Sequence, residues 1–547
     1  MIASKHKRFF GKLFKISLKN VCSFQKLILM CLFVFLTAFF CYFKTIDFEL
    51  TGLDDINFIN TCAPAYKKGA VSVFIEAFKT NCCYNLWPTS YYRPVLALSF
   101  SLSDKIKGQS VKFAHLVNIL LHCLSSVLVF FFLRRYLFDA KVSFLAALLF
   151  AVSPITVYTA AWIPGRNDSV FFINFLLSFI FFIEYAGKQK IYLFIISSVF
   201  MLMCFFTKES GIIIPFVFIL YSLTNKTFRK ISKIPVFLTW AVSIAVFIYM
   251  RKAAVSSASF SPGMINLIRD NLDMFFDYYA SVMFLRTPFG LNVTSKIYFL
   301  GAAAFLLTFF FAFFKKSGAE RLKMSFFFLL PLIFIAVNIA GERLWFQGNR
   351  MYLPLFAVIV LFFSFASKYL KNKNEIVLSG AVVLITVSFM ITFRSMDSFK
   401  NSLSFWSAIV KDSRLENITA KKFHVYALVD NGMISEAAAE SLYIAQITNF
   451  EFPEINYLSA DTLLLNRDYV RSSEVFEYLI SKGQMVNQTT YAGAIISFHY
   501  LNNPEKQQYY FDEFVKFTGA HPERINEFLN NYAANLETRR TPKTTGK

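Results

Sequence analysis

Long runs of apolar residues recur along this chain of 547 residues, and they limit its possible folds more than any other feature. A helix needs about 20 mostly apolar residues to cross the hydrocarbon core of a bilayer. The candidate runs are 27–43, 113–133, 142–162, 169–186, 191–206, 211–223, 234–249, 297–314, 324–340, 351–366 and 376–393. Only 16% of the residues are charged, against about 25% in soluble chains. The sequence therefore predicts an all-α polytopic membrane protein with about 11 transmembrane helices.

The formal net charge of +22 at first suggests a nucleic-acid-binding protein, but a hydrophobic content of 56% argues against that class. Short cytoplasmic loops of membrane proteins collect lysine and arginine. Basic residues gather in the N-terminal segment 1–26 and in every second connection after it. We therefore expect a cytoplasmic N-terminus, a large first external loop at 45–112, and an external C-terminus. No nucleic-acid partner is expected.

Residues 272–291 form an ambiguous stretch that is apolar but contains Asp273, Asp277, Arg286 and Pro288. Counting it as a span would place the following basic cluster, 315–323, on the external side, against the charge rule. We interpret this stretch as an external loop with an interfacial or re-entrant helix.

Three cysteines, Cys62, Cys82 and Cys83, share the first external loop. One disulfide among them is compatible with an oxidising compartment, and three free thiols are equally compatible.

The composition changes after the transmembrane domain, which spans 27–394. Paired amphipathic helices are expected from 398 to 534, and they are 420–431 with 435–446, 455–466 with 470–481, and 491–502 with 505–518. The pairs recur about every 35 residues, close to the 34-residue tetratricopeptide period. We predict an external domain of helical repeats of the tetratricopeptide type, followed by a disordered tail at 535–547.

Polar residues near the ends of spans are functional candidates, because they are costly within a membrane. Five clusters lie at predicted external ends: Asp54 with Asp55; Arg93 with His115, Asn118 and His122; Arg166 with Asn167 and Asp168; Lys208 with Glu209; and Glu342 and Arg343 with Arg350. Because all five share one predicted side, we expect a single site that faces outside.

The residue types in these clusters suggest specific chemistry. Adjacent carboxylates such as Asp54 and Asp55 can serve as a general base or as metal ligands, although a solvated loop start would look the same. His115, Asn118 and His122 share one helix face, which suits either a cavity or hydrogen bonds between helices. Their spacing is poor evidence for zinc, so no metal site is predicted. Guanidinium groups suit a phosphate, while lipid-headgroup contact is the simpler alternative for any single one.

Several motifs, read in order, resemble those of the transmembrane-and-tetratricopeptide-repeat O-mannosyltransferases and their bacterial relatives in the GT-C superfamily. They are Tyr-Tyr-Arg-Pro at 91–94, the stretch from His115 to His122, Ser-Pro at 153–154 with 162–168, Lys-Glu at 208–209, 342–354, and Ser-Phe-Trp at 404–406. The chain departs from the family pattern at Leu53, Ile155 and Pro164, which leaves the sugar and the acceptor open.

The resemblance implies a GT-C type fold that transfers a sugar, mannose or a similar hexose, from a polyprenyl- or dolichyl-phosphate donor. The acceptor would be a hydroxyl, usually of a protein serine or threonine, on the periplasmic or luminal side. An inverting reaction needs a general base, and fixed cations stabilise the leaving phosphate. Asp54 or Asp55 would be the base. The donor phosphate would contact Arg93, Arg166, Lys208, Arg343 and Arg350, and the substrate cavity would include His115, Asn118, His122, Asn167, Asp168, Glu209 and Glu342.

Two other interpretations stay open at this stage. The same fold could act on a lipid or polysaccharide acceptor, or the chain could be a non-catalytic membrane scaffold that uses its repeats for assembly. Repeat solenoids bind peptides, which favours a polypeptide acceptor. No cofactor is expected to be required, although a divalent cation is compatible with the chemistry. The abundance of Phe and Lys favours a bacterial inner membrane over the endoplasmic reticulum.

Overall fold

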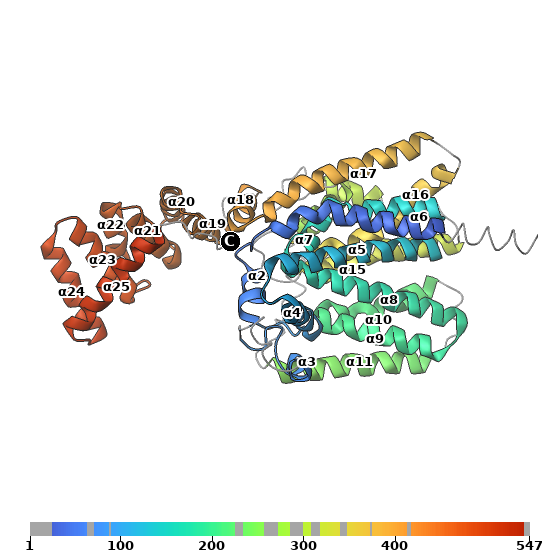
Figure 1. Cartoon of the computed structure of the whole chain (residues 1–547), viewed down its shortest axis with the longest axis horizontal. Coiled ribbons are helices and arrows are strands. Elements are labelled where there is room, and N and C mark those ends of the chain that lie inside the picture. The colour runs from blue at the N-terminus through green and yellow to red at the C-terminus, as the bar shows by residue number, and fades with distance from the viewer. Residues whose placement is uncertain are drawn as a thin grey trace, which may run out of the picture. The chain divides into compact units, whose positions relative to one another are not determined.

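The computed structural model describes residues 25–62, 70–86, 89–224, 233–255, 272–284, 299–307, 318–339, 347–371, 375–412 and 417–540. Every regular element within these ranges is a helix, as the all-α prediction requires (Figure 1). Contacts divide the chain into two compact units. The transmembrane unit comprises residues 1–288 and 293–401, and the repeat unit comprises 289–292 and 402–547.

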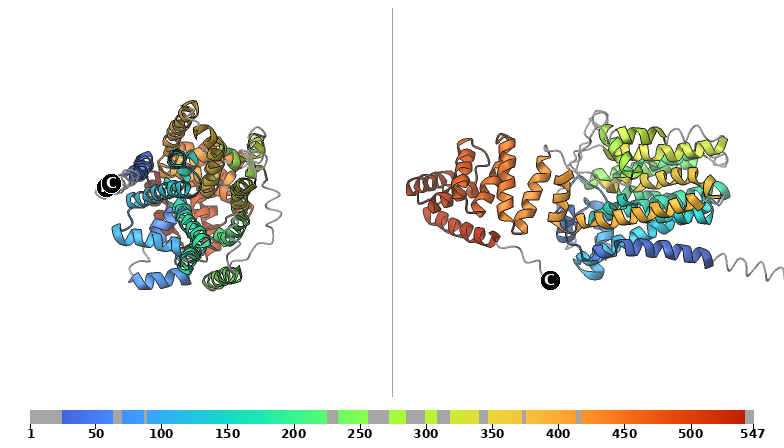
Figure 2. Two further views of the ribbon diagram at one scale, coloured as in Figure 1. Left: turned by 90° about the vertical axis from the view of Figure 1, so that its right-hand side faces the viewer. Right: turned by 90° about the horizontal axis from the view of Figure 1, so that it is seen from above.

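The transmembrane unit contains long apolar helices that run side by side (Figure 2). Six helices in the described ranges are long and apolar enough to cross a membrane, and they are Gln25–Asp47, Val111–Tyr136, Ile163–Lys188, Ile234–Ala254, Gly348–Ser367 and Leu378–Phe399. The helix pair Ala140–Ala151 and Pro154–Ala160, bent by 49°, is a seventh candidate. Shorter apolar helices cover Ile191–Thr207, Glu209–Leu223 and Met324–Phe334. Integral membrane character is thus supported, whereas the count of eleven crossings and their orientation stay predictions.

Four helices carry predicted polar residues or begin or end directly beside them. They are α5 (Val111–Tyr136), α8 (Arg166–Lys188), α9 (Ile191–Thr207) and α16 (Tyr352–Lys371). The stretch read as an interfacial or re-entrant segment contains α13 (Leu272–Met283). Its depth in the membrane stays a prediction.

Short broken segments position the starts of α8 and α16. After α6 (Ala140–Ala151), Pro154 interrupts the helix because it lacks an amide hydrogen and restricts the preceding residue. A Cβ at Gly165, just before α8, would lie 2.4 Å from the carbonyl oxygen of Tyr158. A Cβ at Gly348, just before α16, would lie 2.2 Å from the Tyr158 ring. Two glycines therefore allow both helix starts to meet at one tyrosine.

A buried hydrogen-bond chain through His122 ties three helices of the bundle together. Its Nδ1 lies 2.7 Å from the hydroxyl of Tyr352 on α16, and its Nε2 lies 2.9 Å from the carbonyl oxygen of Ala151 on α6. Both ring nitrogens of this α5 residue are therefore occupied by helix-to-helix contacts. The polar stripe on α5 was expected to face a cavity or to form hydrogen bonds between helices. The contacts of His122 fit hydrogen bonding between helices.

The segment predicted to be the first external loop, 45–112, contains short helices and a disulfide-bonded cysteine. Its helices include α2 (Asp54–Ile56), α3 (Ala70–Lys79) and α4 (Pro94–Lys107). Cys83 is disulfide-bonded, whereas Cys82 is a buried free thiol. The sequence allowed either one disulfide or three free thiols here, and the bonded state of Cys83 excludes three free thiols. The cysteine bonded to Cys83 lies outside the side chains that the structure describes.

The repeat unit consists of stacked helical hairpins. After α18 (Ser402–Asp412) come α19 (Ile418–Asp430) with α20 (Ile434–Ile447), α21 (Pro453–Leu465) with α22 (Tyr469–Ser481), and α23 (Gln488–Tyr500) with α24 (Pro504–Thr518). These bounds lie within a few residues of the six predicted helices. The turn residues Gly432, Arg467 and Asn502 all have positive φ, which gives each hairpin the same tight reversal. The assignment to the tetratricopeptide class stays a prediction.

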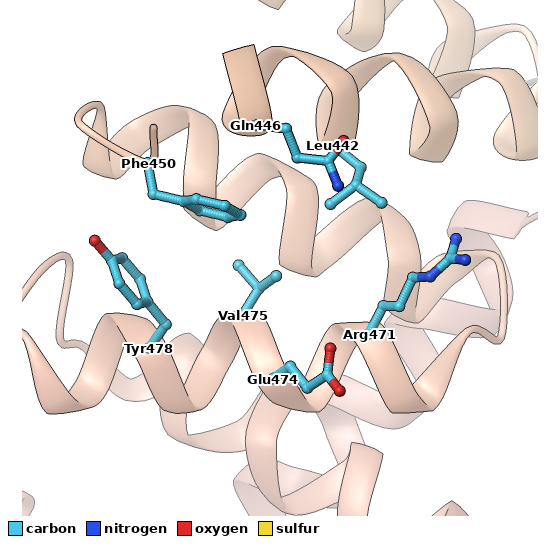
Figure 3. Close-up of a pocket in the computed structure, with 7 residues that line it drawn as sticks. All are labelled: Leu442, Gln446, Phe450, Arg471, Glu474, Val475 and Tyr478. Carbon is cyan, nitrogen blue, oxygen red and sulfur yellow. The ribbon is translucent and has the colours of Figure 1, made fainter. Parts of the chain in front are cut away.

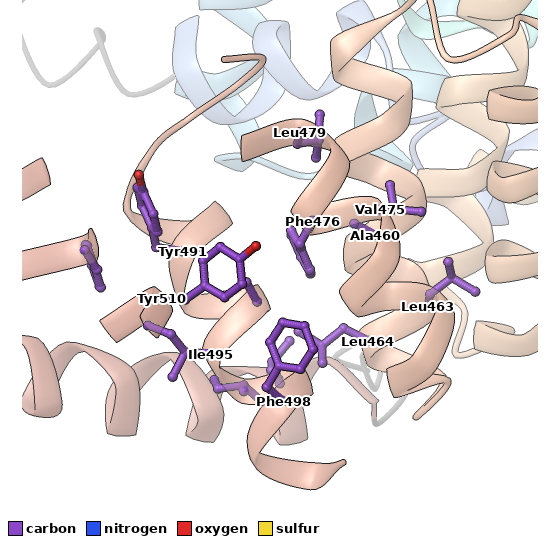
Figure 4. Packing of buried hydrophobic residues seen from close by; sticks show 14 of the residues in the cluster. Ala460, Leu463, Leu464, Val475, Phe476, Leu479, Tyr491, Ile495, Phe498 and Tyr510 are labelled. Carbon is purple, nitrogen blue, oxygen red and sulfur yellow. The ribbon is translucent and has the colours of Figure 1, made fainter. Parts of the chain in front are cut away.

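The second and third hairpins share a hydrophobic core, in which Phe476, Leu479, Ile495 and Phe498 are buried among their neighbours (Figure 4). A second cluster joins the first hairpin to α21. One further helix, α25 (Pro522–Arg540), packs on the core of the second and third hairpins through Ile525 and Leu536. It extends beyond the predicted end of the repeats at residue 534 and through the first six residues of the segment expected to be disordered, 535–547. The structure corrects that part of the boundary.

The hydrogen bond between His122 and Tyr352 leads to a stability prediction. Tyr352→Phe removes only the hydroxyl and leaves a buried imidazole nitrogen without its partner, which should lower the free energy of unfolding by about 1–2 kcal/mol. Thermal unfolding of the purified protein in detergent measures the change. Tyr249→Phe is the matched control, because Tyr249 is 76% exposed. Equal midpoints for the two variants would contradict a stabilising role for this contact.

Candidate functional site

A cluster of charged side chains forms where the first external loop meets the ends of α8, α9 and α16. It joins members of all five groups expected from the sequence, although those groups are far apart along the chain. The members with described contacts to one another are Asp54, Arg93, Asn167, Asp168, Lys208, Glu209 and Arg350, together with Asn349. We refer to these eight residues as the charged cluster.

Asp168 is the central carboxylate of the charged cluster. It lies in the first turn of α8 and is buried. Its Oδ1 lies 2.7 Å from the Nζ of Lys208, and its Oδ2 accepts a hydrogen bond of 2.7 Å from Asn349. The carboxylate thus joins three chain segments, because Lys208 follows α9 and Asn349 lies in η8 (Gly348–Met351) just before α16.

Lys208 lies among several charges. Burial lowers its pKa, and Asp168 opposes that shift. The positive charges of Arg350 and Arg93 lower the pKa of Lys208 further. Three cations from separate parts of the chain therefore act on one region, which is the arrangement that an anionic group requires.

Arg93 is held by a second ion pair. Its Nε donates to Glu209 over 2.9 Å, and the backbone amide of Tyr92 donates to the other oxygen of the same carboxylate over 3.0 Å. With the Asn167 amide oriented to suit its neighbours, its oxygen accepts from Arg93 over 3.2 Å and its nitrogen donates to the carbonyl of Thr207 over 2.8 Å. Arg93 is therefore fixed from both sides before any ligand arrives.

Asp55 is held by hydrogen bonds within its own turn. It is only 1% exposed, and both of its oxygens accept hydrogen bonds. Oδ2 accepts from the hydroxyl of Thr51 over 2.9 Å and from the amide of the same residue, while Oδ1 accepts from the amides of Leu53 and Ile56 over 3.1 and 3.0 Å. Trp162 in turn donates to the Thr51 hydroxyl over 3.2 Å. These bonds leave Asp55 little capacity for a reacting proton.

Asp54 has different surroundings from Asp55. Its side chain is half-buried. Burial raises its pKa to about 6, the charge of Asp55 adds to this, and Arg93 partly offsets it. A carboxyl with a pKa of about 6 can accept a proton from a reacting hydroxyl under physiological conditions.

Arg166 and Asn118 are joined to each other by a buried hydrogen bond. Arg166 is fully buried, and it donates to the Asn118 side chain over 2.9 Å, to the hydroxyl of Ser103 over 2.9 Å and to the carbonyl of Ala114 over 3.0 Å. Asn118 donates to the carbonyls of Trp162 and Ile163. Through these contacts, the guanidinium of Arg166 holds α4, α5 and α8 together.

The remaining candidates are His115, Glu342 and Arg343. His115 is buried on α5, with its ring edge-on to Phe48 at 6.3 Å between centroids. Glu342 and Arg343 lie outside the described residues. Within the described part of the chain, no three His, Cys, Asp or Glu side chains converge as metal ligands would. Independence from metal ions and cofactors stays a prediction.

The hydrogen bonds from Thr51 to Asp55 and from Trp162 to Thr51 were not expected from the sequence. Thr51 lies four residues before Asp55, a spacing that could have suggested a local hydrogen bond. The link to Trp162 spans 111 positions and gives no local signal.

A separate pocket of about 550 Å³ lies between α20 and α22 of the repeat unit (Figure 3). Its lining mixes the apolar side chains of Leu442, Phe450 and Val475 with Arg471 and Glu474. None of the candidates from the sequence lines it.

Comparison with known proteins confirms the predicted resemblance. Residues 92–250, which contain Arg93, Arg166, Asp168 and Lys208, match the family model described as dolichyl-phosphate-mannose-protein mannosyltransferase. The human protein O-mannosyl-transferase TMTC1 is 32% identical over 149 residues, which cover 25% of this chain and 17% of that protein. The mouse protein O-mannosyl-transferase TMTC2 is 38% identical over 98 residues, covering 18% of this chain and 12% of that protein. The matched stretches thus cover less than a fifth of these relatives' own length, and the chain resembles GT-C glycosyltransferases of this kind.

The contacts of Arg166 predict that even a conservative substitution at this position lowers the stability of the fold substantially. Arg166→Lys keeps the charge but cannot reach the same set of acceptors, so the free energy of unfolding should fall by about 2–3 kcal/mol. Thermal unfolding in detergent again provides the measurement. The control is Arg135→Lys, because the Arg135 side chain is 56% exposed and pairs with Glu184 at the surface, where such pairs contribute about 0–1 kcal/mol. A loss no greater than that of the control would mean that the buried contacts of Arg166 do not stabilise the fold.

Proposed function

We propose that this chain is a membrane glycosyltransferase that takes mannose or a similar hexose from a polyprenyl- or dolichyl-phosphate donor. The acceptor is a hydroxyl, of a protein serine or threonine, on the periplasmic or luminal side of the membrane. The observation that carries the proposal is that Asp54, whose pKa burial raises to about 6, lies within electrostatic reach of the guanidinium of Arg93, which Glu209 holds in place. The local match of residues 92–250 to the mannosyltransferase family model supports the same reaction class.

Asp54 is the better candidate for the general base, although the sequence left Asp54 and Asp55 equivalent. A base needs a free lone pair within reach of the acceptor. Asp55 spends both oxygens on Thr51 and on backbone amides. Asp54 is half-buried, and no donor among the described residues forms a hydrogen bond to its carboxylate. We assign Asp55 to positioning the turn that presents Asp54.

The reaction proceeds in one step. The acceptor oxygen bonds to the anomeric carbon as the bond from that carbon to the phosphate oxygen breaks, and the acceptor proton moves to Asp54. The sugar is thereby inverted, and the lipid phosphate leaves with one more negative charge. Fixed cations lower the energy of such a transition state because they need no reorganisation as charge develops.

The cations of the charged cluster suit that leaving group. Arg93 is held by Glu209, and Lys208 is held by Asp168, so both have fixed positions before the donor binds. Arg350 acts on the same region through its effect on the pKa of Lys208. As Asp54 becomes neutral, the negative charge that it loses appears on the phosphate. The total charge of the site therefore stays constant during transfer.

The base assignment predicts a strong effect of one substitution. Asp54→Asn should lower the turnover number by about 100-fold or more, because proton removal by a positioned group typically contributes 10²–10⁴-fold. Transfer of radiolabelled hexose from a polyprenyl-phosphate donor to an acceptor peptide, in proteoliposomes, measures the rate. Asp47→Asn is the matched control, because it makes the same change in the same loop on a side chain that is 74% exposed and pairs with Lys112. A turnover number for Asp54→Asn equal to that of the control would remove Asp54 from the mechanism.

The pKa of Asp54 also predicts how the rate depends on pH. The base acts only when deprotonated, so kcat/KM should fall as the pH drops through about 6 and should level off above it. An acid limb near pH 4, typical of an exposed carboxyl, would contradict the assignment of this half-buried group.

A further inference from the structure

The helix α3 has a buried side and a separate apolar side that is exposed. Val73 and Ala77 are buried in a small hydrophobic cluster beside α4. The side chains of Val71, Phe74 and Ile75 are 74%, 55% and 47% exposed. Residues that are three or four positions apart share one side of a helix, so these three side chains form a single stripe. We call Val71, Phe74 and Ile75 the α3 stripe.

The polar residues of α3 lie on a third side of the helix. Ser72 and Lys79 are seven positions apart, which brings them to the same side, and both are exposed. A stripe of large apolar side chains is unfavourable in water. A helix with an exposed apolar side and a separate polar side is typical of a segment that lies in the interface between a membrane and water.

α3 lies beside one end of a candidate membrane span. It contacts α11 (Lys233–Ala254) and runs crosswise to it (Figures 1 and 2). A helix that crosses a bilayer runs close to the membrane normal, so a helix that lies crosswise to it runs along the membrane surface. Leu238 and Val242 of α11 are apolar and exposed, as expected of a span that faces lipid.

A series of aromatic contacts joins the α3 stripe to that span. The ring of Phe74 lies 5.1 Å from that of Phe78, and the ring of Phe78 lies 5.1 Å from that of Phe206 at the end of α9. The Phe206 ring lies 5.9 Å from that of Phe247 on α11. Phe247 is seven residues before the end of α11, or about 10 Å along the helix. The α3 stripe is therefore continuous with the apolar surface of the span, near its end.

Tyr92 connects α3 to the charged cluster. Its hydroxyl donates to the carbonyl of Phe78, the last aromatic residue of α3, over 2.9 Å. Its backbone amide donates to Glu209 over 3.0 Å, and the same carboxylate holds Arg93. The position of α3 is thus linked, through one tyrosine, to the position of a guanidinium of the charged cluster.

We propose that α3 is an interfacial helix and that the α3 stripe inserts into the bilayer on the side of the charged cluster. Lipid covers the stripe in the membrane, while Ser72 and Lys79 face water and the headgroups. A lysine beside an inserted stripe suits anionic headgroups. Through Tyr92, the inserted helix holds Arg93 near the level of the headgroups. The contact with lipid does not depend on sugar transfer, so its test contains no donor.

Photo-crosslinking to lipid tests the proposal on the full chain in liposomes of phosphatidylethanolamine and phosphatidylglycerol that contain a radiolabelled phosphatidylcholine. Phe74→p-benzoylphenylalanine places the crosslinker on the stripe. Ser72→p-benzoylphenylalanine is the matched control, because Ser72 is an exposed residue of the same helix on its polar side. Position 74 should capture at least fivefold more lipid than position 72. Equal capture at the two positions, or a crosslink from position 74 to a second copy of the chain in place of lipid, would contradict the proposal.

Carbene labelling of the unaltered chain gives a second readout if the substituted chains do not fold. The chain in the same liposomes is treated with a lipid-soluble diazirine or with a water-soluble one, and modified residues are identified by mass spectrometry. The ratio of lipid-soluble to water-soluble labelling should be at least fivefold higher at Phe74 and Ile75 than at Ser72 and Lys79. The same ratio on both sides of α3 would mean that the stripe faces water, and the proposal would be wrong.

Discussion

The buried ion pair between Asp168 and Lys208 is the interaction on which the candidate site depends. A buried pair repays the cost of removing both charges from water only when its geometry is good and further hydrogen bonds satisfy it. Asn349 supplies such a bond, and in doing so brings the start of α16 to the ends of α8 and α9. Losing any one of the three would leave a buried charge or amide without its partner. The same contacts place Arg350 and Arg93 within electrostatic reach of Lys208.

The sequence predicted the helical fold and singled out the residues that form the charged cluster, because both follow from the cost of polarity in a membrane. Apolar runs long enough to cross a bilayer must be helical, since lipid offers no partners to backbone groups. Charges at the ends of these runs are retained only where something holds them, so Asp168, Lys208 and Glu209 stood out without any structural information. The six repeat helices were predicted for a related reason, because their periodic apolar positions must share one core.

Roles that depend on long-range contacts could not be predicted. Arg166 had no visible partner in the sequence, whereas the folded chain brings the side chains of Asn118 and Ser103 and two backbone carbonyls around it. Asp54 and Asp55 are adjacent and chemically identical, and only the turn at Thr51 distinguishes them. The end of α25 was missed because Arg539 and Arg540 read as a charged tail, whereas their acceptors lie on α21, more than 70 positions earlier.

Sugar transfer from a lipid phosphate is the central claim, and a donor comparison tests it most directly. The purified chain in proteoliposomes would receive hexose on polyprenyl phosphate or on a nucleotide diphosphate, with a serine- and threonine-containing peptide as acceptor. Mass spectrometry of the peptide, with the anomeric configuration determined by NMR, reports transfer. We predict hexose on a hydroxyl, with inverted configuration, from the polyprenyl-phosphate donor alone. Transfer from the nucleotide donor alone, retention of configuration, or no transfer from either donor to peptide would contradict the account.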